Sequence, residues 1–249
     1  MGPTATTTTH SAATEKRRMT RQEKFVVLAS SLGTVFEWYD FYLVGALASH
    51  ISKSFFAGIN PTAAFIFTLL SFAAGFAVRP FGALVFGRLG DVVGRKYTFL
   101  ATIVIMGLAT FLIGFIPGFA TIGIAAPILF IAMRLMQGFA LGGEYGGAVI
   151  YVAEHSPASE RGTWTAWIQT TAAGGLLLSL GVISLCRWQL GEQAFADWGW
   201  RVPFIVSLVL VGISVLMRLK LNESPAFLKM KEEGKTSKAP ISEAFGHWK

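Results

Sequence analysis

Long apolar stretches separated by short polar connections dominate this chain. A helix needs about 20 apolar residues to cross a bilayer, and six stretches reach or approach that length. They are predicted as helices at about 25–50, 62–86, 98–116, 125–152, 164–186 and 202–219. Because a helix satisfies its backbone hydrogen bonds internally, the pattern predicts an all-α membrane domain with six transmembrane helices over residues 25–221.

Polar segments flank this domain. Residues 1–24 are rich in Thr, Ala and Ser and then become basic, which predicts a disordered tail. The apolar run that follows is too long for a signal peptide and carries Glu37 and Asp40, so we expect it to remain as the first helix. Residues 222–249 are polar and rich in lysine, which predicts a cytoplasmic loop.

Composition indicates a membrane protein and argues against other classes. Charged residues make up 14% of the chain, against about 25% in soluble domains. The net charge of +7 does not indicate a nucleic-acid partner, because the basic residues lie in the gaps between spans. The single cysteine, Cys186, excludes an intramolecular disulfide and a multi-cysteine metal site. No metal, cofactor or enzymatic activity is predicted, since the four histidines lie in tails, loops or at a helix end.

The distribution of Lys and Arg predicts the orientation in the membrane. With the N-terminus in the cytoplasm, that face receives sixteen of the 21 basic residues, including Arg218 and those after it. The opposite face receives Lys53, Arg187 and Arg201, and two more fall inside spans. Cytoplasmic loops carry the excess of Lys and Arg, so both termini are predicted to be cytoplasmic.

Five ionisable side chains fall within the predicted spans: Glu37, Asp40, Arg79, Arg134 and Glu144. Each costs roughly 2.5–3.5 kcal/mol on insertion scales, so it must pair or face water. Counting the helical rise from the span ends predicts that Glu37 and Asp40 pair with Arg134, and that Glu144 pairs with Arg79. Intramembrane charges mark a solute or proton path, and purely structural ion pairs are the alternative.

Glycines recur along the fourth span. Gly138, Gly142 and Gly146 follow one another at four-residue spacing, and Gly143 with Gly147 forms a second row. Rows of small residues let another helix approach closely, so helix packing is the favoured interpretation. Approach of a solute to the helix backbone is the alternative.

The segment between the second and third spans carries a recognisable pattern. It resembles the loop between helices 2 and 3 of the major facilitator superfamily, and it lies at the same place among the predicted spans. Val92 departs from the pattern, in which a basic residue is usual. The residues that match are Gly87, Asp91, Gly94, Arg95 and Lys96.

Further matches cover nearly the whole chain. Arg134-Leu-Met-Gln137-Gly138 resembles the fourth-helix motif, and the segment from Tyr151 to Gly162 resembles the inner loop after it. The chain is most similar to the metabolite:proton symporter branch, which includes carriers of α-ketoglutarate, citrate, shikimate, proline and glycine betaine. The remaining matching segments are Glu37–Tyr42, Arg79–Ala83, Trp198–Phe204 and Glu223–Phe227.

The resemblance implies a rocker-switch carrier built from an inverted three-plus-three repeat, with the first and fourth helices lining a cavity. An acid of the first helix would carry the proton, and an arginine would hold an anionic solute, because a guanidinium suits a carboxylate. The fifth span lacks the Gly-Pro element of drug antiporters, which favours symport. The candidate residues for proton coupling and solute binding are Glu37, Tyr39, Asp40, Arg79, Arg134, Gln137 and Glu144.

Charged residues at the cytoplasmic helix ends predict a conformational latch. In the superfamily such a cluster stabilises the outward-open state, and each exposed contact contributes only about 0–1 kcal/mol. Orientation in the membrane is a second role for the basic members of the cluster. The predicted latch residues are Gly87, Asp91, Gly94, Arg95, Glu154 and Arg161.

The sequence therefore predicts proton-coupled uptake of a small organic acid or zwitterion by alternating access across a bacterial-type inner membrane. The superfamily has two six-helix halves and this chain supplies one, so we expect a fragment or a truncated product. A second copy that completes the carrier is the alternative. A sugar-porter-like carrier and a non-transporting membrane protein with a structural role remain as alternative functions.

Overall fold

The computed structural model describes residues 20–157, 159–220 and 225–233, and these residues form helices and the short connections between them. The remaining residues of both predicted polar ends, 1–19 and most of 222–249, lie outside the described part. The helices are α1 Arg21–Ala46, α2 Ala48–Phe55, α3 Pro61–Val93, α4 Arg95–Ile113, α5 Phe119–Ile122, α6 Ala125–His155, α7 Arg161–Asp197, the 3-10 helix η1 Gly199–Arg201, α8 Val202–Leu219 and α9 Pro225–Glu232.

The first predicted span consists of two helices. α1 begins at Arg21, so the prediction of disorder over residues 1–24 is wrong at its C-terminal end. Leu47 then interrupts the helix with φ −104° and ψ 14°, and α2 continues from the next residue. The apolar pattern runs through this break, which is why the sequence did not reveal it.

The predicted loop from Gly87 to Lys96 is wrong in extent. α3 continues to Val93 and α4 starts at Arg95, so Gly94 alone connects them. Its φ of 119° lies in the region that favours glycine. With 33 residues α3 is about 50 Å long, more than the roughly 30 Å hydrocarbon layer, so its last turns project beyond the apolar stretch.

Five helices in the described part of the chain are long and apolar enough to cross a membrane: α3, α4, α6, α7 and α8 together with η1. The first helix, α1, is not one of these five because its middle carries polar and acidic residues. α3 starts with an N-cap, since the Asn60 side chain accepts a 2.9 Å hydrogen bond from the backbone N–H of Thr62 and Pro61 occupies the first turn.

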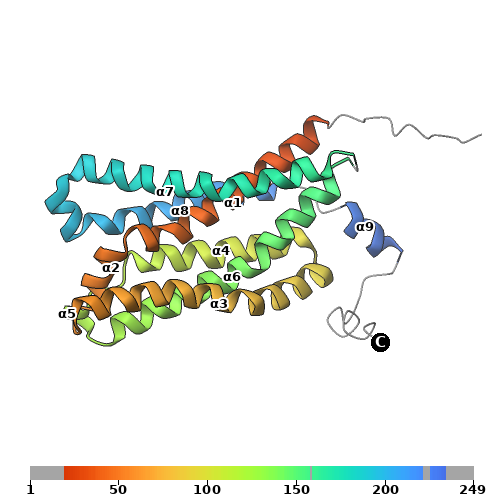
Figure 1. Cartoon of the computed structure of the whole chain (residues 1–249). Coiled ribbons are helices and arrows are strands. Elements are labelled where there is room, and N and C mark those ends of the chain that lie inside the picture. Colours follow the sequence, from red (N-terminus) through yellow and green to blue (C-terminus); the bar gives the residue numbers. More distant parts are fainter. Residues whose placement is uncertain (1–19, 158, 221–224, 234–249) are drawn as a thin grey trace, which may run out of the picture.

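The helices form two layers that run in parallel along the molecule (Figure 1). One layer contains α1, α7 and α8, and the other contains α3, α4 and α6. α1 packs along α7 as α3 packs along α6, while α4 and α8 pack on each other between the two pairs. Exchanging the long helices α1, α3 and α4 with α6, α7 and α8 converts the α1–α7 contact into the α6–α3 contact and leaves the α4–α8 contact in place, as an inverted three-plus-three repeat requires.

Glycines allow the closest helix contacts. A Cβ on Gly138 would meet the backbone of Gly75, and one on Gly82 would meet the backbone of Phe139, so α3 and α6 touch backbone to backbone. In the matching pair, a Cβ on Gly175 of α7 would meet the backbone of α1 near Tyr39. The fourth-span glycines at the centre of the row therefore serve close helix packing.

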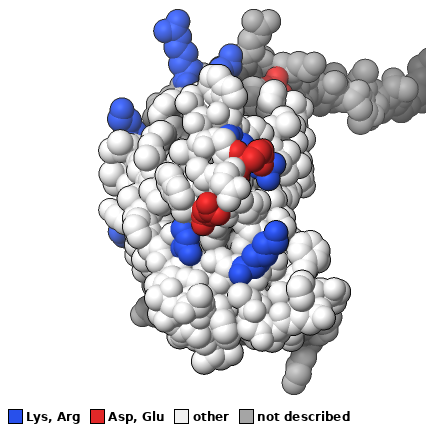
Figure 2. Space-filling model, turned by 90° about the vertical axis from the view of Figure 1, so that its left-hand side faces the viewer, with Lys and Arg blue, Asp and Glu red and all other residues white. Residues whose placement is uncertain are grey.

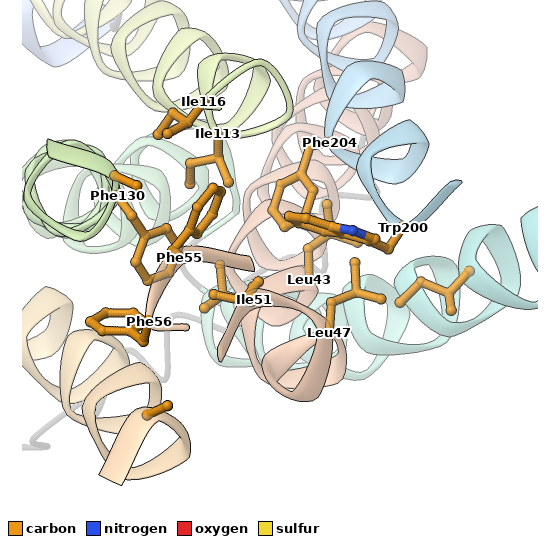
Figure 3. Close-up of a cluster of buried hydrophobic side chains, with 14 of the residues drawn as sticks. Leu43, Leu47, Ile51, Phe55, Phe56, Ile113, Ile116, Phe130, Trp200 and Phe204 are labelled. Carbon is orange, nitrogen blue, oxygen red and sulfur yellow. The ribbon is translucent and has the colours of Figure 1, made fainter. Parts of the chain in front are cut away.

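The largest apolar cluster lies where α2 meets the ends of α1, α4, α6 and α8, as Figure 3 shows. Leu43, Phe55, Phe130 and Phe204 are fully buried there. Arg201 fastens this end, because its Nη1 donates to the carbonyl oxygens of Gly114 at 3.0 Å and of Ile116 at 2.6 Å. Both carbonyls follow the last turn of α4 and would otherwise lack helical partners.

Figure 2 looks onto this end of the molecule, which is mostly uncharged with a small group of acidic and basic side chains. Exposed side chains along the flanks are predominantly large and apolar, including Phe81 of α3 and Leu177 of α7, which are 64% and 70% exposed. A flank of this kind suits lipid or another apolar helix surface rather than water.

Candidate functional site

Charged side chains from three helices meet in the interior of the bundle. Glu37, Asp40, Arg134, Glu144 and Arg218 are each at most 4% exposed. Charges at such depth are retained in membrane domains only where they are paired or serve a solute or proton path. They separate into two clusters.

In the first cluster, the carboxylates of Glu37 and Glu144 both contact the guanidinium of Arg218. Nη2 of Arg218 lies 3.3 Å from Oε1 of Glu37 and also contacts Oε1 of Glu144. Thr102 of α4 donates its hydroxyl to the other oxygen of Glu144 at 2.9 Å. We call Glu37, Glu144 and Arg218 the charged triad. It joins α1, α6 and α8.

Arg218 was assigned to the cytoplasmic face from the sequence, and that assignment is wrong. It is 3% exposed and points into the bundle from the last turn of α8. Its row on α8, with Ser207, Val211 and Ser214, is buried throughout. These residues are three or four positions apart, so they share one face of α8, and Arg218 still lies inside the predicted span. That pattern could have indicated from the sequence that Arg218 is buried in the bundle.

The second cluster surrounds Arg134. Its Nη1 donates to Oε1 of Gln137, and the Gln137 amide donates to the Thr110 hydroxyl at 2.5 Å. The Thr110 hydroxyl itself donates to the carbonyl oxygen of Met106 at 3.0 Å. Among the described residues Asp40 and Arg134 form no ion pair, and Arg134 donates to Gln137 instead, so the predicted direct pair is wrong.

Arg79 also differs from the prediction. Its backbone carbonyl faces α6, since a Cβ on Gly142 would meet it, so the side chain projects toward α1 instead of toward Glu144. The guanidinium carbon lies 3.8 Å from the ring centre of Phe76, 4.5 Å from Phe41 and 5.7 Å from Trp38. The predicted pair between Arg79 and Glu144 is wrong.

Arg79 and Arg134 thus lie on the same aromatic ring. The guanidinium carbon of Arg134 is 4.9 Å from the centre of Phe41, and the two cations are close enough to repel each other. Within the described part of the chain, Nε and Nη2 of both arginines are buried and have no hydrogen-bond partner. Two neighbouring cations with unused donors are suited to a bidentate anion.

A small cavity lies between the two clusters. Its volume is about 10 Å³, which matches the space of one water molecule. Glu37 and Asp40 line it, together with Gly33 and Ser214. The two acids of α1 therefore share a water-sized space rather than a direct contact with Arg134.

Tyr39 has a structural position in this arrangement. Its hydroxyl donates to the carbonyl oxygen of Pro203 at 2.7 Å, and its ring is fully buried in the apolar cluster. The side chain fastens α1 to the start of α8.

The predicted latch residues lie at the end of the bundle where α3, α4 and α6 end or begin. Arg95 forms an ion pair with Glu154 at 3.2 Å, and both side chains are partly exposed. Nε of Arg161 donates to the carbonyl oxygen of Ala153 at 2.9 Å. Asp91 is exposed and lines a cavity of about 240 Å³ with Arg95 and with Gly143, Gly146 and Gly147 of α6.

The sequence did not identify the hydroxyl partners of the buried charges. Thr98, Thr102, Met106 and Thr110 follow one another at four-residue spacing on α4, and all four are buried. A row of threonines along an otherwise apolar span is the signal for them. Among the described residues, no group of three His, Cys, Asp or Glu side chains is placed to hold a metal ion.

Comparison with known proteins agrees with this architecture. The chain is 45% identical over 201 residues to the proline/betaine transporter of Salmonella typhimurium, covering 81% of this chain and 40% of that protein. It is 43% identical over 217 residues to the inner membrane metabolite transport protein YhjE of Escherichia coli, covering 87% and 49%. The shikimate transporter of Escherichia coli is 40% identical over 201 residues, with coverage of 80% and 46%.

Solved structures with the same fold include the xylose transporter XylE of Escherichia coli in a partially occluded inward-open conformation. The TM-score is 0.75 at 19% identity, and the match covers 87% of this chain and 52% of that one. The chain thus spans about half the length of the proteins that it matches. Residues 25–246 match the family described as sugar (and other) transporter. The chain therefore belongs to this transporter family of the major facilitator superfamily, as its sequence motifs predicted.

Proposed function

We propose that this chain supplies the solute-binding and proton-binding helices of a carrier that couples uptake of a small carboxylate-bearing metabolite to proton entry. The observation that carries the proposal is the pair Arg79 and Arg134, whose guanidinium carbons lie 4.5 Å and 4.9 Å from the centre of the same Phe41 ring with buried donors unused. A carboxylate between them would neutralise their repulsion and accept their hydrogen bonds. No carboxylate of the described chain contacts either guanidinium within salt-bridge distance.

Aromatic side chains next to the arginine pair favour a zwitterion. Trp38 stacks on Tyr42 with ring centres 5.5 Å apart, and the indole N–H of Trp38 has no hydrogen-bond partner among the described residues. Aromatic faces bind ammonium groups through cation–π attraction. Proline and betaine, which the proline/betaine transporter of Salmonella typhimurium carries by name, combine such a cationic centre with a carboxylate.

The charges and the fold support the proposed direction and proton coupling. The buried acids of α1 provide a proton site near the arginine pair, and alternating access of the repeat exposes it to one side at a time. The excess of Lys and Arg in the polar segments of the sequence supports a cytoplasmic position for both termini. The Arg95–Glu154 pair would then close the cytoplasmic side in the outward-open state.

Sugar transport is the second candidate, because the family name includes sugars and the solved structures with this fold carry xylose by name. A sugar has no carboxylate, so it would leave the charge of Arg79 and Arg134 uncompensated. Uptake of xylose in place of a carboxylate-bearing solute would therefore favour this alternative.

Uptake into liposomes tests the proposal. The purified chain is reconstituted, and accumulation of labelled proline, glycine betaine, shikimate and xylose is measured with and without an inwardly directed proton gradient. We expect gradient-dependent accumulation of at least one carboxylate-bearing solute. Accumulation of none of them above empty liposomes would overturn the proposed function.

A matched pair of variants tests the site. Arg134→Lys keeps the charge but loses the planar donor pair, and we expect it to reduce affinity for the transported carboxylate by about tenfold or more, since each 1.4 kcal/mol is tenfold. Arg88→Lys is the control, because Arg88 is an exposed residue of α3, and it should leave the affinity for the carboxylate unchanged. Trp38 lies close enough to Arg79 for its fluorescence to report solute binding independently of transport.

A further inference from the structure

The charged triad contains one more acid than base. Oε1 of Glu37 and Oε1 of Glu144 contact the same nitrogen of Arg218, so a single guanidinium faces two carboxylates. All three side chains are at most 4% exposed. Hydration by bulk water is therefore not available to offset the extra negative charge.

Counting charges gives the proton content of the triad. With both glutamates ionised the group carries a net charge of −1, and with one proton on the pair it is neutral. Two carboxylates held side by side in a dry site cannot both ionise without a large cost, and one shared proton is the usual result. Both carboxylates contact the same nitrogen of Arg218, so they lie side by side on one guanidinium.

The neighbouring groups do not supply a second cation. The charges that act on Glu37 are Glu144 of α6, Arg218 of α8 and Asp40 of its own helix, and Asp40 is another acid. α4 contributes the Thr102 hydroxyl to Glu144, while the Phe99 ring lies 5.0 Å from the guanidinium carbon of Arg218. Among the described residues α7 adds no charge to this set.

We propose that Glu37 and Glu144 share one exchangeable proton on Arg218, and that this shared site carries the proton of the symport. The assignment of this proton to symport rests on the proposed function, and the shared proton itself does not. Asp40 lines the same water-sized cavity as Glu37, three residues further along α1. The charge of the triad therefore acts on Asp40 without a direct contact.

A proton that enters this site from water comes to rest between two carboxylate oxygens, and it leaves to water on the opposite side after the carrier reorients. Gain of the proton removes the net negative charge next to Asp40, and its loss restores that charge. Removing either glutamate leaves one carboxylate on one guanidinium. That pair is neutral with no proton, so each single variant should lose the exchangeable proton.

Infrared difference spectroscopy tests this directly. The whole chain in lipid is titrated, and the carbonyl stretching band of protonated carboxyl groups is followed with pH. We expect the pH-dependent band of the wild-type chain to disappear in both Glu37→Gln and Glu144→Gln. It should persist in Asp40→Asn and in the control Glu192→Gln, which changes an exposed acid of α7 in the same way.

The outcomes separate the shared site from the proposed function. A band that persists in either glutamate variant, or that disappears in Asp40→Asn alone, overturns the shared site even if proton-driven uptake is observed. Loss of the band in both glutamate variants without any proton-driven uptake supports the shared site and contradicts the symport. A thermal unfolding measurement on each variant confirms that the bundle is intact, and Glu→Gln changes preserve side-chain size.

Discussion

Glu37 of α1 and Arg218 of α8 are 181 residues apart in the sequence, and their side chains meet at 3.3 Å inside the bundle. The contact depends on Gly33, one helical turn before Glu37. A Cβ at Gly33 would lie 2.7 Å from Nη2 of Arg218, the same nitrogen that both glutamates contact. The missing side chain of a glycine is therefore what allows the arginine to reach α1.

Replacing Gly33 by alanine should displace the Arg218 guanidinium and weaken its contact with Glu37. Gly212→Ala on α8 is the control, because a Cβ there meets nothing within 4 Å. Both changes gain about 0.5–1 kcal/mol of helix propensity. We expect Gly33→Ala to lie about 1–3 kcal/mol below the control in the free energy of unfolding, as overpacking costs that amount. Equal stability of the two variants would contradict the contact.

Removing the cation of the triad should give a pH-dependent loss of stability. Arg218→Met leaves two buried carboxylates without a partner, and breaking a buried ion pair in this way costs about 3–5 kcal/mol. The loss should be largest at high pH, where both carboxylates are ionised, and smaller in acid, where protons neutralise them. Unfolding in lipid or detergent at several pH values measures this dependence.

The matched control for that prediction removes all three charges. The variant Arg218→Met/Glu37→Gln/Glu144→Gln leaves no unpaired charge, so its stability should recover relative to Arg218→Met and should vary less with pH. A triple variant as unstable as the single one would show that Arg218 acts through packing on Phe99 rather than through its charge.

Two glycines of α6 should respond differently to replacement by alanine: Gly142→Ala should destabilise the protein, and Gly146→Ala should not. A Cβ on Gly142 would run into the backbone of Arg79, while one on Gly146 meets nothing within 4 Å. Gly142→Ala must separate α3 from α6 and should cost about 1–3 kcal/mol, and Gly146→Ala should be neutral or slightly stabilising. Because the shift also moves Arg79, Gly142→Ala should weaken carboxylate binding, and Gly146→Ala should not.

The ion pair between Arg95 and Glu154 should be weak and sensitive to salt. Its partly exposed side chains predict a coupling energy of about 0.2–1 kcal/mol, measured by a double-mutant cycle of Arg95→Gln and Glu154→Gln. The exchange Arg95→Glu with Glu154→Arg should restore part of the stability that either reversal loses alone. A coupling energy that does not fall with added salt would contradict a surface pair.

Much of the helical layout was predictable because lipid imposes a simple rule. Every spanning segment must be a long apolar helix, so the boundaries of α8 at 202–219 and the start of α6 at Ala125 follow from hydropathy alone. The family also follows from the sequence, because its motifs depend on residue type and spacing. The end of α3 at Val93 does not, since its last turns extend beyond the apolar layer that the pattern detects.

The sequence by itself determined that Glu37, Asp40, Arg79, Arg134 and Glu144 lie inside the membrane domain. Only the tertiary structure decided their partners, because depth along a helix says nothing about the direction in which a side chain points around it. Gly142 packs closely on the backbone of Arg79, so the Arg79 side chain points toward Phe41. The absence of a side chain at Gly33 leaves room for Arg218 to contact both Glu37 and Glu144. The partners of the buried charges depend on which helices can approach each other closely. That approach depends on contacts between residues far apart in the chain.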